Sequence, residues 1–365
     1  MLGTPTRTSA QALPAAPARP RLRTSGRLLP WAASVALLAV AAVLGVTHGA
    51  AEIPLTAAFA LLFDWLPLVE VRADVPASWE RILVDVRLPR VVASAMVGGA
   101  LAFSGASYQG VFRNPLADPF LLGVASGAGL GAAIAIVSPL PVDSYGFGWV
   151  PLFAFAGALL AVSVVYMLSR TGRAVDNATL LLAGIALSAI ASALTSFMLL
   201  TGGDRAFPIL SFLFGGFNTA SWPRILMATP YVVVGVAVIA LHSRALNVLQ
   251  LDEEQAAHLG VDVARTKLIV LAAASLMAAA AVAVAGIIGF VGLIVPHAVR
   301  LLFGRDYRML LPLCALLGAA FVILVDVAAR QVLAPQEVPV GIVTQILGAP
   351  FFLYLLRARR GGLLP

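Results

Sequence analysis

The sequence predicts an all-α integral membrane protein whose chain crosses the membrane ten times. Of its 365 residues, 61% are hydrophobic and 11% are charged, whereas about 25% of the residues of a soluble domain are charged. Ten apolar runs approach the roughly 20 residues that a helix needs to span a bilayer. They cover approximately residues 29–47, 90–110, 119–138, 149–169, 179–200, 225–242, 268–286, 287–303, 310–329 and 339–357.

The chain before the first run has a different composition. Residues 1–27 are rich in Pro, Ala, Thr and Arg and show no apolar period. This predicts a disordered, basic cytoplasmic tail ahead of a ten-span domain at residues 28–365. A cleaved signal peptide is the alternative interpretation of the tail and the first run, but that run is long enough to span the membrane, which argues against cleavage.

Small residues recur every four positions along the second and third runs, at Gly98, Ala102, Ala106 and Gly110 and again at Gly123, Gly127 and Gly131. This spacing lets helix backbones approach closely in lipid, where packing replaces the hydrophobic driving force. The segment that joins the two runs, residues 112–119, is polar and contains two prolines. We therefore expect it to form a turn outside the bilayer.

The apolar stretch at residues 268–302 contains no charged residue before Arg300. At about 1.5 Å per residue, this stretch is too long for one crossing. We therefore expect two spans, divided near Gly286 and Gly289.

The basic residues predict the orientation. With the N-terminus in the cytoplasm, 17 of the 24 Lys and Arg residues fall on the cytoplasmic side, which agrees with the positive-inside rule and places both termini in the cytoplasm. The sequence pI near 10.3 would also fit a nucleic-acid patch. Because the basic residues are scattered over loops, we expect membrane lipid as a partner and no nucleic acid.

Motifs for catalysis are missing from the sequence. The only lysine, Lys267, is followed by Leu268, so there is no phosphate-binding GxxxxGK[ST] loop. The four histidines lie far apart, without metal-site spacing, and we expect neither enzymatic activity nor a cofactor. His297, which follows Pro296, remains open to two interpretations: a haem or metal ligand, or a hydrogen-bonded histidine at a proline kink.

Several long segments, in the same order, resemble the permease subunits of bacterial ABC importers for iron chelates, haem and vitamin B12, the FecCD family. They are RLPRVVASAMVGGALAFSGASYQGVFRNPLADPFLLGVASGAGLG from Arg87, LLLAGIALS from Leu180, GFVGLIVPHAVR from Gly289 and EVPVGIVTQILGAPFFLYLLRARR from Glu337. The resemblance extends from about Leu29 onward.

This resemblance implies a ten-helix type II permease in the bacterial inner membrane. The permease would form a homodimer with the pathway on its two-fold axis, with two cytoplasmic ABC ATPase subunits and one periplasmic substrate-binding protein. It would carry a ferric siderophore, haem or cobalamin, and the pathway residues do not distinguish these cargoes. ATP would be hydrolysed by the separate subunits.

The loop at residues 243–267 is the candidate for coupling to the ATPase. Asp252 with Gln255 is a helix-capping signal, Gly260 is a stop signal, and Asp262 caps a second short helix. A solvated connector is the alternative. The resemblance implies that the loop fits a cleft on the ATPase, through Leu249, Asp252, Glu253, Ala256, Leu259 and Gly260.

Three arginines are candidates for docking on the outer side. Arg87 and Arg90 begin the second span, and Arg330 ends the ninth. In vitamin B12 permeases of the family, arginines at matching positions pair with acidic residues on the two lobes of the binding protein, a contact that sets register and association rate. The alternatives are membrane-interface anchors, or a local pair of Arg330 with Asp326.

The resemblance also places a cytoplasmic gate and a pathway. The gate would comprise Asn114 and Leu116 from one loop and Asp176 and Asn177 from another. At the second loop the family often has Ser or Thr, and Asp176 and Asn177 could equally cap the fifth span. The pathway wall would comprise Ser188, Ser192, Thr195, Ser196 and Met198 in span five and Thr344 and Gln345 in span ten. Such hydroxyls often bond only to their own or neighbouring helices.

An ion-coupled secondary transporter of a metal chelate is the rival interpretation. Such a protein needs ionisable residues deep within its spans. Spans two to five contain essentially none away from their ends, and Asp326 lies near the outer end of its own span. The sequence therefore favours ATP-driven transport.

Overall fold

The computed structural model describes residues 25–49, 54, 56, 76–139, 148–171, 174–175 and 177–360. Residues 1–24 of the predicted tail and Asp176 of the predicted gate lie outside these ranges. Residues 25–27, predicted as part of the tail, belong to the first helix.

The described chain is all-α, as predicted, apart from one small hairpin. The first half contains α1 (Ser25–Thr47), α3 (Ala77–Arg81), the π-helix η1 (Ile82–Arg87), α4 (Leu88–Phe112), the 3₁₀ helix η2 (Pro119–Leu122), α5 (Val124–Val137), α6 (Trp149–Leu168), β1 (Arg170–Thr171), β2 (Ala174–Val175) and α7 (Asn177–Thr201). The second half contains η3 (Gly203–Arg205), α8 (Ala206–Phe214), α9 (Trp222–Leu241), α10 (Ser243–Val248), α11 (Glu253–His258), α12 (Val263–Ala285), α13 (Val291–Phe303), α14 (Tyr307–Gln331) and α15 (Val340–Arg360). The two strands pair antiparallel.

Each of the ten predicted apolar runs contains one α-helix. Among the described residues, seven helical segments are long and apolar enough to cross a membrane, and three further apolar helices are shorter: Val124–Val137, Val291–Phe303 and Val340–Tyr354. The chain is thus a multi-pass membrane protein by length and composition. The count of ten crossings stays a prediction.

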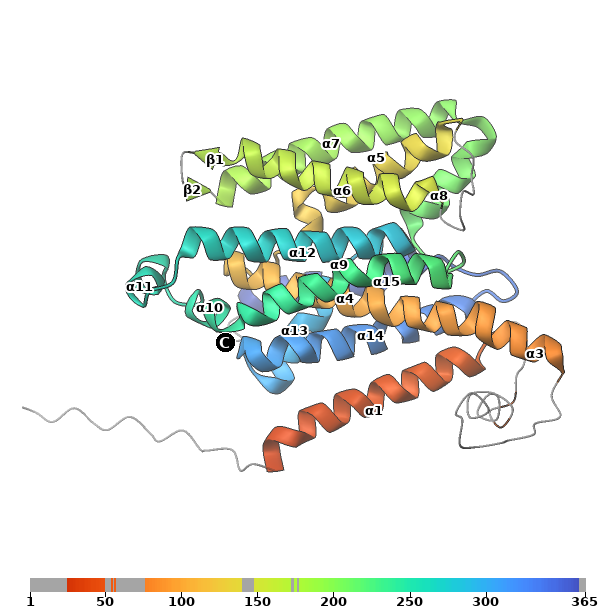
Figure 1. Cartoon of the computed structure of the whole chain (residues 1–365), viewed down its shortest axis with the longest axis horizontal. Helices are drawn as coiled ribbons and strands as arrows, with labels where there is room; N and C mark the ends of the chain where they lie inside the picture. Colours follow the sequence, from red (N-terminus) through yellow and green to blue (C-terminus); the bar gives the residue numbers. More distant parts are fainter. Residues whose placement is uncertain are drawn as a thin grey trace, which may run out of the picture.

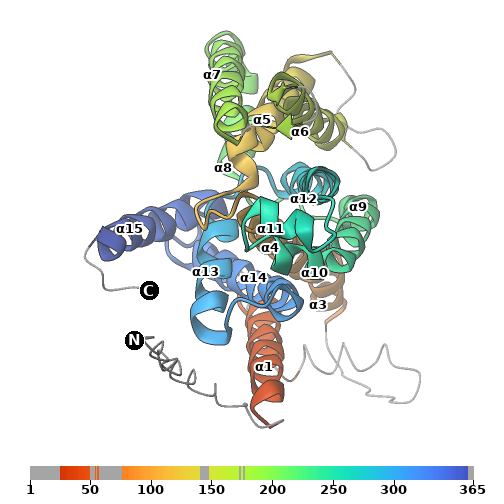
Figure 2. The ribbon, with the colours of Figure 1, turned by 90° about the vertical axis from the view of Figure 1, so that its left-hand side faces the viewer.

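The helices are arranged around α4, which runs through the centre of the bundle with α12, α9, α14 and α13 beside it (Figure 2). The apolar windows of α4 and α12 are each 78% buried, whereas those of α1, α7 and α9 are each 22% buried. α4 and α12 are therefore the inner helices. The outer helices present apolar side chains to their surroundings, as helices in lipid do.

Small residues allow α4 to contact its neighbours at backbone distance. A Cβ added at Gly98 would fall on the carbonyl oxygen of Gly318 in α14, and one added at Gly105 would fall on that of Gly292 in α13. Gly127 of α5 approaches Gly157 of α6 in the same way. The prediction that small residues bring helix backbones together is confirmed at Gly98 and Gly127, and Gly105 adds a contact that was not predicted.

Gly123, predicted inside a helix, has another role. It lies between η2 and α5 with φ +85°, a left-handed conformation that glycine adopts without steric cost. The division of the long apolar stretch is confirmed, because α12 ends at Ala285 and α13 begins at Val291, and Gly286 has φ +69°.

Two features were not predicted. The second span begins well before residue 90, because α3, η1 and α4 form one helical run from Ala77 to Phe112. The charged residues of η1 interrupted the apolar pattern on which the prediction depended. The helix α8 follows α7 almost directly and contacts α5. At nine residues, it is too short to register as a spanning run.

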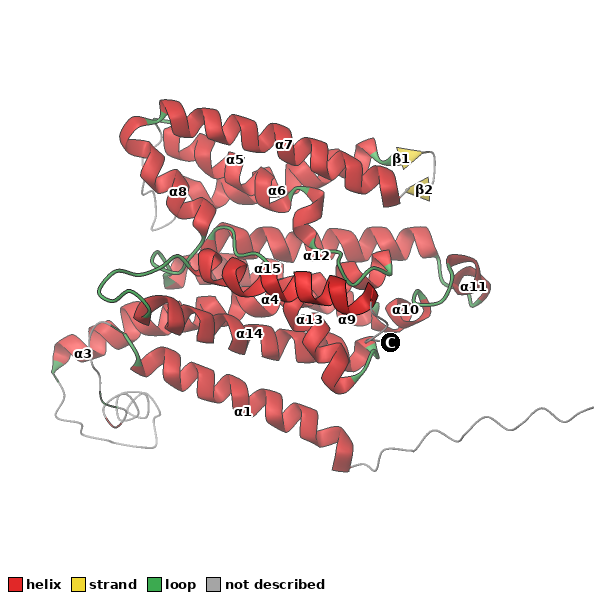
Figure 3. Ribbon diagram, turned by 180° about the vertical axis from the view of Figure 1, so that it is seen from behind, coloured by secondary structure: helices red, strands yellow, loops and turns green. Residues whose placement is uncertain are grey.

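The bundle has two distinct ends. α10, α11, the β1–β2 hairpin, the start of α1 and the end of α15 lie at one end, called here the α11 end (Figure 1). α3 and α8 lie at the opposite end, called here the α3 end (Figure 3). The first and last described helices thus have their outer termini at the same end as the predicted coupling loop.

Candidate docking, coupling and gating sites

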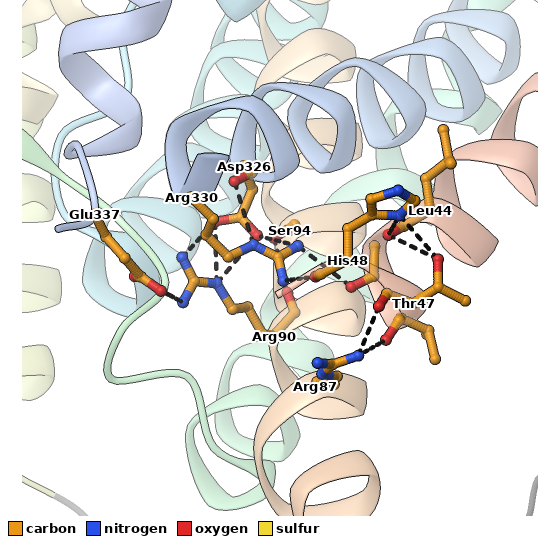
Figure 4. Close-up of polar contacts among 11 residues, drawn as sticks. Leu44, Thr47, His48, Arg87, Arg90, Ser94, Asp326, Arg330 and Glu337 are labelled. Carbon is orange, nitrogen blue, oxygen red and sulfur yellow. Dashed lines mark hydrogen bonds and ion pairs between the residues drawn. The ribbon is translucent and has the colours of Figure 1, made fainter. Parts of the chain in front are cut away.

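Five charged residues form a cluster near the α3 end, called here the outer arginine cluster: Arg87, Arg90, Asp326, Arg330 and Glu337 (Figure 4). Nε of Arg90 donates to both carboxylate oxygens of Asp326, at 3.1 and 3.0 Å, and Nη2 donates to Oδ1 at 2.9 Å. Nη1 of the same side chain donates to Glu337 at 3.1 and 2.9 Å. One guanidinium therefore holds two carboxylates on different edges.

The remaining contacts of the cluster tie three helices together. Nη2 of Arg330 lies 3.1 Å from Oδ2 of Asp326, one turn earlier in α14, which confirms the local pair that the sequence left open. Arg330 also donates to the carbonyl oxygens of His48 and Gly45 at the end of α1, and Nη1 of Arg87 donates to those of Val46 and Thr47. Together with the pairing of Arg90 and Asp326, these hydrogen bonds join α1, α4 and α14 near the α3 end.

Burial differs sharply among these side chains. The side chain of Asp326 is 1% exposed, that of Arg330 6% and that of Arg90 10%, whereas that of Glu337 is 32% exposed. A buried ion pair contributes little net stability, but removing one partner leaves an uncompensated charge and is costly. Asp326 therefore works as an internal brace, and Glu337 is the more exposed of the two acids. Docking through these arginines stays a prediction.

The π-helix η1 lies immediately before the cluster. Its wider turn ends at Arg87 and is followed directly by α4. π-helical turns are uncommon and often occur at functional sites. On its other side, η1 is held by Trp222 of α9, whose Nε1 donates to the carbonyl oxygen of Val84 at 3.0 Å. The helix that positions Arg87 and Arg90 is thus fixed from two directions.

The predicted coupling loop contains two short helices, of which only α11, between Asp252 and Gly260, is one of the two expected. They are α10 and α11, whereas Asp262 caps the long helix α12 by accepting a hydrogen bond from the backbone N of Arg265 at 3.0 Å. Asp252 occupies the N-cap position of α11, yet its side chain makes no cap bond there. The carboxylate is drawn instead to Arg113, at 3.2 Å. Gly260, with φ +84°, ends the loop's second helix as predicted.

The candidate coupling residues divide by exposure. Leu249 and Ala256 are 1% and 0% exposed, so they hold the two short helices against the bundle and do not reach a partner in this conformation. Leu259, in contrast, is 64% exposed. Asp252 and Gly260 are also exposed, and Glu253 is partly buried. The surface offered for contact lies at both ends of α11.

Arg113 links this loop to the end of α4. It has φ +49° and terminates α4 in a left-handed conformation. Its Nη1 donates to the carbonyl oxygen of Leu251 at 3.1 Å, and its Nη2 lies 3.6 Å from Glu253. Glu253 in turn accepts a hydrogen bond from Lys267 of α12 at 2.6 Å. α11 is therefore held between the ends of α4 and α12.

The predicted gate is described in part. Oδ1 of Asn114 accepts a hydrogen bond from the backbone N of Leu116 at 3.0 Å, so the two residues form a compact turn directly after Arg113. Both are partly buried. Asn177 is the first residue of α7, but its side chain lies outside the described residues, as does the whole of Asp176. Gating stays a prediction.

Asp118 completes the same connection. Its side chain is buried and accepts a hydrogen bond from the backbone N of Phe120 at 2.8 Å, which caps η2. Burial raises the pKa of Asp118 to about 6, and the bond from Phe120 opposes that rise. The sequence analysis did not single it out, although an acid between two prolines could have been noted as a cap.

The predicted pathway residues separate into two kinds. Thr195 and Thr344 are buried, and their hydroxyls donate to carbonyl oxygens of their own helices. Ser188 accepts a hydrogen bond from Ser126 of α5 at 3.0 Å. The others face outward or are partly buried: Ser192, Ser196, Met198 and Gln345.

In Figure 2, α7 lies at the top of the molecule and α15 projects to the left of the helices around α4. Large apolar side chains on both helices are more than half exposed, at Leu182, Ile185, Ile190, Phe197, Leu200, Ile346, Leu353 and Tyr354. Exposed apolar side chains on membrane helices face lipid or another protein. The outward-facing pathway candidates lie on these same two helices.

His297 lies on α13, where its ring packs edge-on against Phe351 of α15 at a centroid distance of 5.8 Å. Among the described residues, no group of three or more His, Cys, Asp or Glu side chains could hold a metal ion. His297 thus lies at the contact between α13 and α15.

Comparison with known proteins decides the family. The FecCD transport family matches residues 37–358, which is most of the chain. The chain belongs to the FecCD transport family. This membership makes it a transport permease subunit.

Named relatives and one solved structure agree with this membership. The chain is 50% identical over 285 residues to the cobalamin import system permease protein BtuC of Halobacterium salinarum, covering 78% of this chain and 76% of that one. It is 42% identical over 293 residues to the hemin transport system permease protein HmuU of Yersinia pestis, covering 78% and 85%. A metal-chelate type ABC transporter solved in an inward-facing conformation matches with TM-score 0.76 and 30% identity, covering 91% of this chain and 99% of that one.

Proposed function

We propose that this chain is the membrane permease of an ATP-driven importer for a large metal chelate: cobalamin, haem or a ferric siderophore. The match to the FecCD family over residues 37–358 carries the proposal. Cobalamin is the first cargo to test, because the relative with 50% identity is named for cobalamin import. Haem is the second, because of the hemin permease with 42% identity.

The importer we propose contains two copies of the chain, two cytoplasmic ABC ATPase subunits and one periplasmic binding protein. The two copies would meet through α7 and α15, whose exposed apolar side chains need a covering. The bacterial inner membrane is the proposed location, with the α11 end in the cytoplasm and both termini there. The basic residues of that end, among them Arg113, Arg265 and Arg308, support this orientation.

Transport would follow alternating access. The ATPase pair closes on ATP, α10 and α11 move with it, and the connection from Arg113 to Asp118 changes the state of the cytoplasmic gate. Glycine contacts such as Gly105 with Gly292 suit this mechanism, because rigid helices with backbone-level contacts move as units. The outer arginine cluster would receive acidic side chains of the binding protein.

An ion-coupled transporter finds less support in the described residues. Such a mechanism needs a titratable group that changes its partners within the membrane. Asp326 is already held by two arginines, Arg90 and Arg330, in the described structure.

The proposal is tested by isolating the importer with its ATPase and binding protein and titrating the binding protein with cyanocobalamin, hemin and a ferric hydroxamate. We expect tight binding of one of them, and native mass spectrometry should give two permeases, two ATPases and one binding protein. A permease that purifies without an ATPase, or a binding protein that takes none of the three, would contradict the proposal.

A further inference from the structure

The outer arginine cluster presents a conflict between its contacts and its proposed role. A docking arginine needs a guanidinium edge that a partner can reach. Arg90, however, is bound by two carboxylates of its own chain and its side chain is only 10% exposed. An incoming acidic side chain would therefore meet an occupied site.

The two occupants of Arg90 are not equivalent. Asp326 binds the Nε and Nη2 edge, is 1% exposed and is shared with Arg330 in the same helix. Glu337 binds only Nη1, is 32% exposed and lies in the connection between α14 and α15. Removing Asp326 would leave two buried guanidinium groups short of a partner. Removing Glu337 would open one edge of one guanidinium toward the α3 end.

The backbone around Glu337 is fixed while its side chain lies at the surface. The backbone N of Val338 donates to the carbonyl oxygen of Ala329 at 3.0 Å, and that of Gln336 donates to Leu333 at 2.9 Å. These bonds close the connection on both sides of Glu337. The carboxylate can therefore leave Nη1 by rotating its side chain, with the connection unchanged.

We infer that Glu337 is an exchangeable internal carboxylate, which a carboxylate of the binding protein replaces on Nη1 of Arg90 when the importer is engaged. This inference rests on the proposed function. The partner is an acidic side chain, Asp or Glu, carried by the binding protein. The exchange is like for like, so Arg90 keeps a charge-assisted hydrogen bond before and after docking.

The exchange has two physical consequences. It avoids the cost of a buried guanidinium with an unsatisfied edge, a cost that an empty docking site would carry in the resting permease. It also sets the affinity, because the partner must displace Glu337 and then lies beside it as a like charge. Glu337 therefore weakens docking and favours release of the binding protein.

The test measures the dissociation constant of the importer's own binding protein for the permease–ATPase complex at low ionic strength. In Glu337→Gln the competitor is neutral, and we expect about fivefold tighter binding, the effect of one partly exposed ion pair. Glu337→Asp keeps the charge but shortens the side chain by one methylene, and it should also tighten binding. High salt should reduce both effects.

Asp85→Asn is the matched control, because Asp85 is an exposed acid of η1. Its substitution changes the net charge by the same amount as Glu337→Gln but removes no carboxylate from Arg90. It should change the dissociation constant by less than about twofold. The inference is wrong if Glu337→Gln and Glu337→Asp bind no more tightly than Asp85→Asn. A wild-type complex that does not bind the binding protein at all would instead contradict the proposed function.

Discussion

Replacing Asp326 with asparagine tests whether the outer arginine cluster is an internal brace. The substitution keeps the size of the side chain and removes the charge that Arg90 and Arg330 share. Because Asp326 is 1% exposed, water cannot compensate for the loss. Breaking a buried pair by removing one partner costs about 3–5 kcal/mol, and we expect the free energy of unfolding to fall by that amount.

The chain carries its own probe for this measurement. Cys314 is its only cysteine, is 0% exposed and lies in α14, the helix that carries Asp326. A maleimide fluorophore will therefore react with it only as the helix bundle opens. In detergent, the midpoint of thermal labelling should fall by on the order of 10 °C in Asp326→Asn.

Glu337→Gln is the comparison for the same assay. It removes a carboxylate from the same Arg90, but one that is 32% exposed, so solvent screens the loss and we expect a cost of about 1 kcal/mol or less. If Asp326→Asn and Glu337→Gln shift the midpoint equally, or if neither shifts it, the distinction between a fixed and an exchangeable carboxylate is refuted.

Three further predictions concern other parts of the chain. Burial raises the pKa of Asp118 from its ordinary value to about 6, so the charged form of Asp118 costs stability above pH 6, and this cost disappears as pH falls toward 4. Asp118→Asn should therefore be more stable than wild type at pH 8, by up to roughly 3 kcal/mol, and equally stable at pH 4. Equal stability of the two proteins at pH 8 would refute the assignment. Gly105→Ala places a Cβ on the carbonyl oxygen of Gly292 and should lower the labelling midpoint of Cys314 by several degrees. In the control Gly289→Ala, the added Cβ meets nothing within 4 Å, and the midpoint should stay nearly unchanged. A reversed order would show that α4 and α13 are not packed at backbone distance. Arg113→Ala removes the contacts from the end of α4 to Leu251 and Asp252. The number of cargo molecules transported per ATP hydrolysed should fall in proteoliposomes, while ATPase binding is retained. An unchanged number of cargo molecules per ATP would show that α11 moves the gate without Arg113.

Much of the fold follows from the sequence because lipid imposes simple requirements. Apolar length predicted where the helices lie, and each of the ten runs contains one α-helix. The four-residue spacing of small residues predicted the close contacts of Gly98 and Gly127, because small side chains let helix backbones approach. The contact of Gly105 with Gly292 lies outside that spacing and was not predicted. The extension of the second span through η1 was missed, since charged residues at its start conceal a helix that continues beyond the apolar run.

The sites were less accessible from the sequence, because they depend on contacts between distant segments. Arg90 and Glu337 are 247 residues apart in the chain, and no local pattern indicates that they pair. Arg113 and Asp252 are separated by 139 residues, and their contact explains why Asp252 does not cap its own helix. The exposure of Leu259 and the burial of Ala256 likewise depend on how α11 lies against the bundle.

The central claim is that this chain forms the pathway of an ATP-driven importer for a metal chelate. The most direct test is uptake of cyanocobalamin, hemin and a ferric hydroxamate by proteoliposomes that contain the permease and its ATPase, with the binding protein outside. We expect accumulation of one cargo that requires ATP on the α11 side and the binding protein on the α3 side, and that survives ionophores. Uptake that proceeds without ATP and collapses when an ion gradient is dissipated would contradict it.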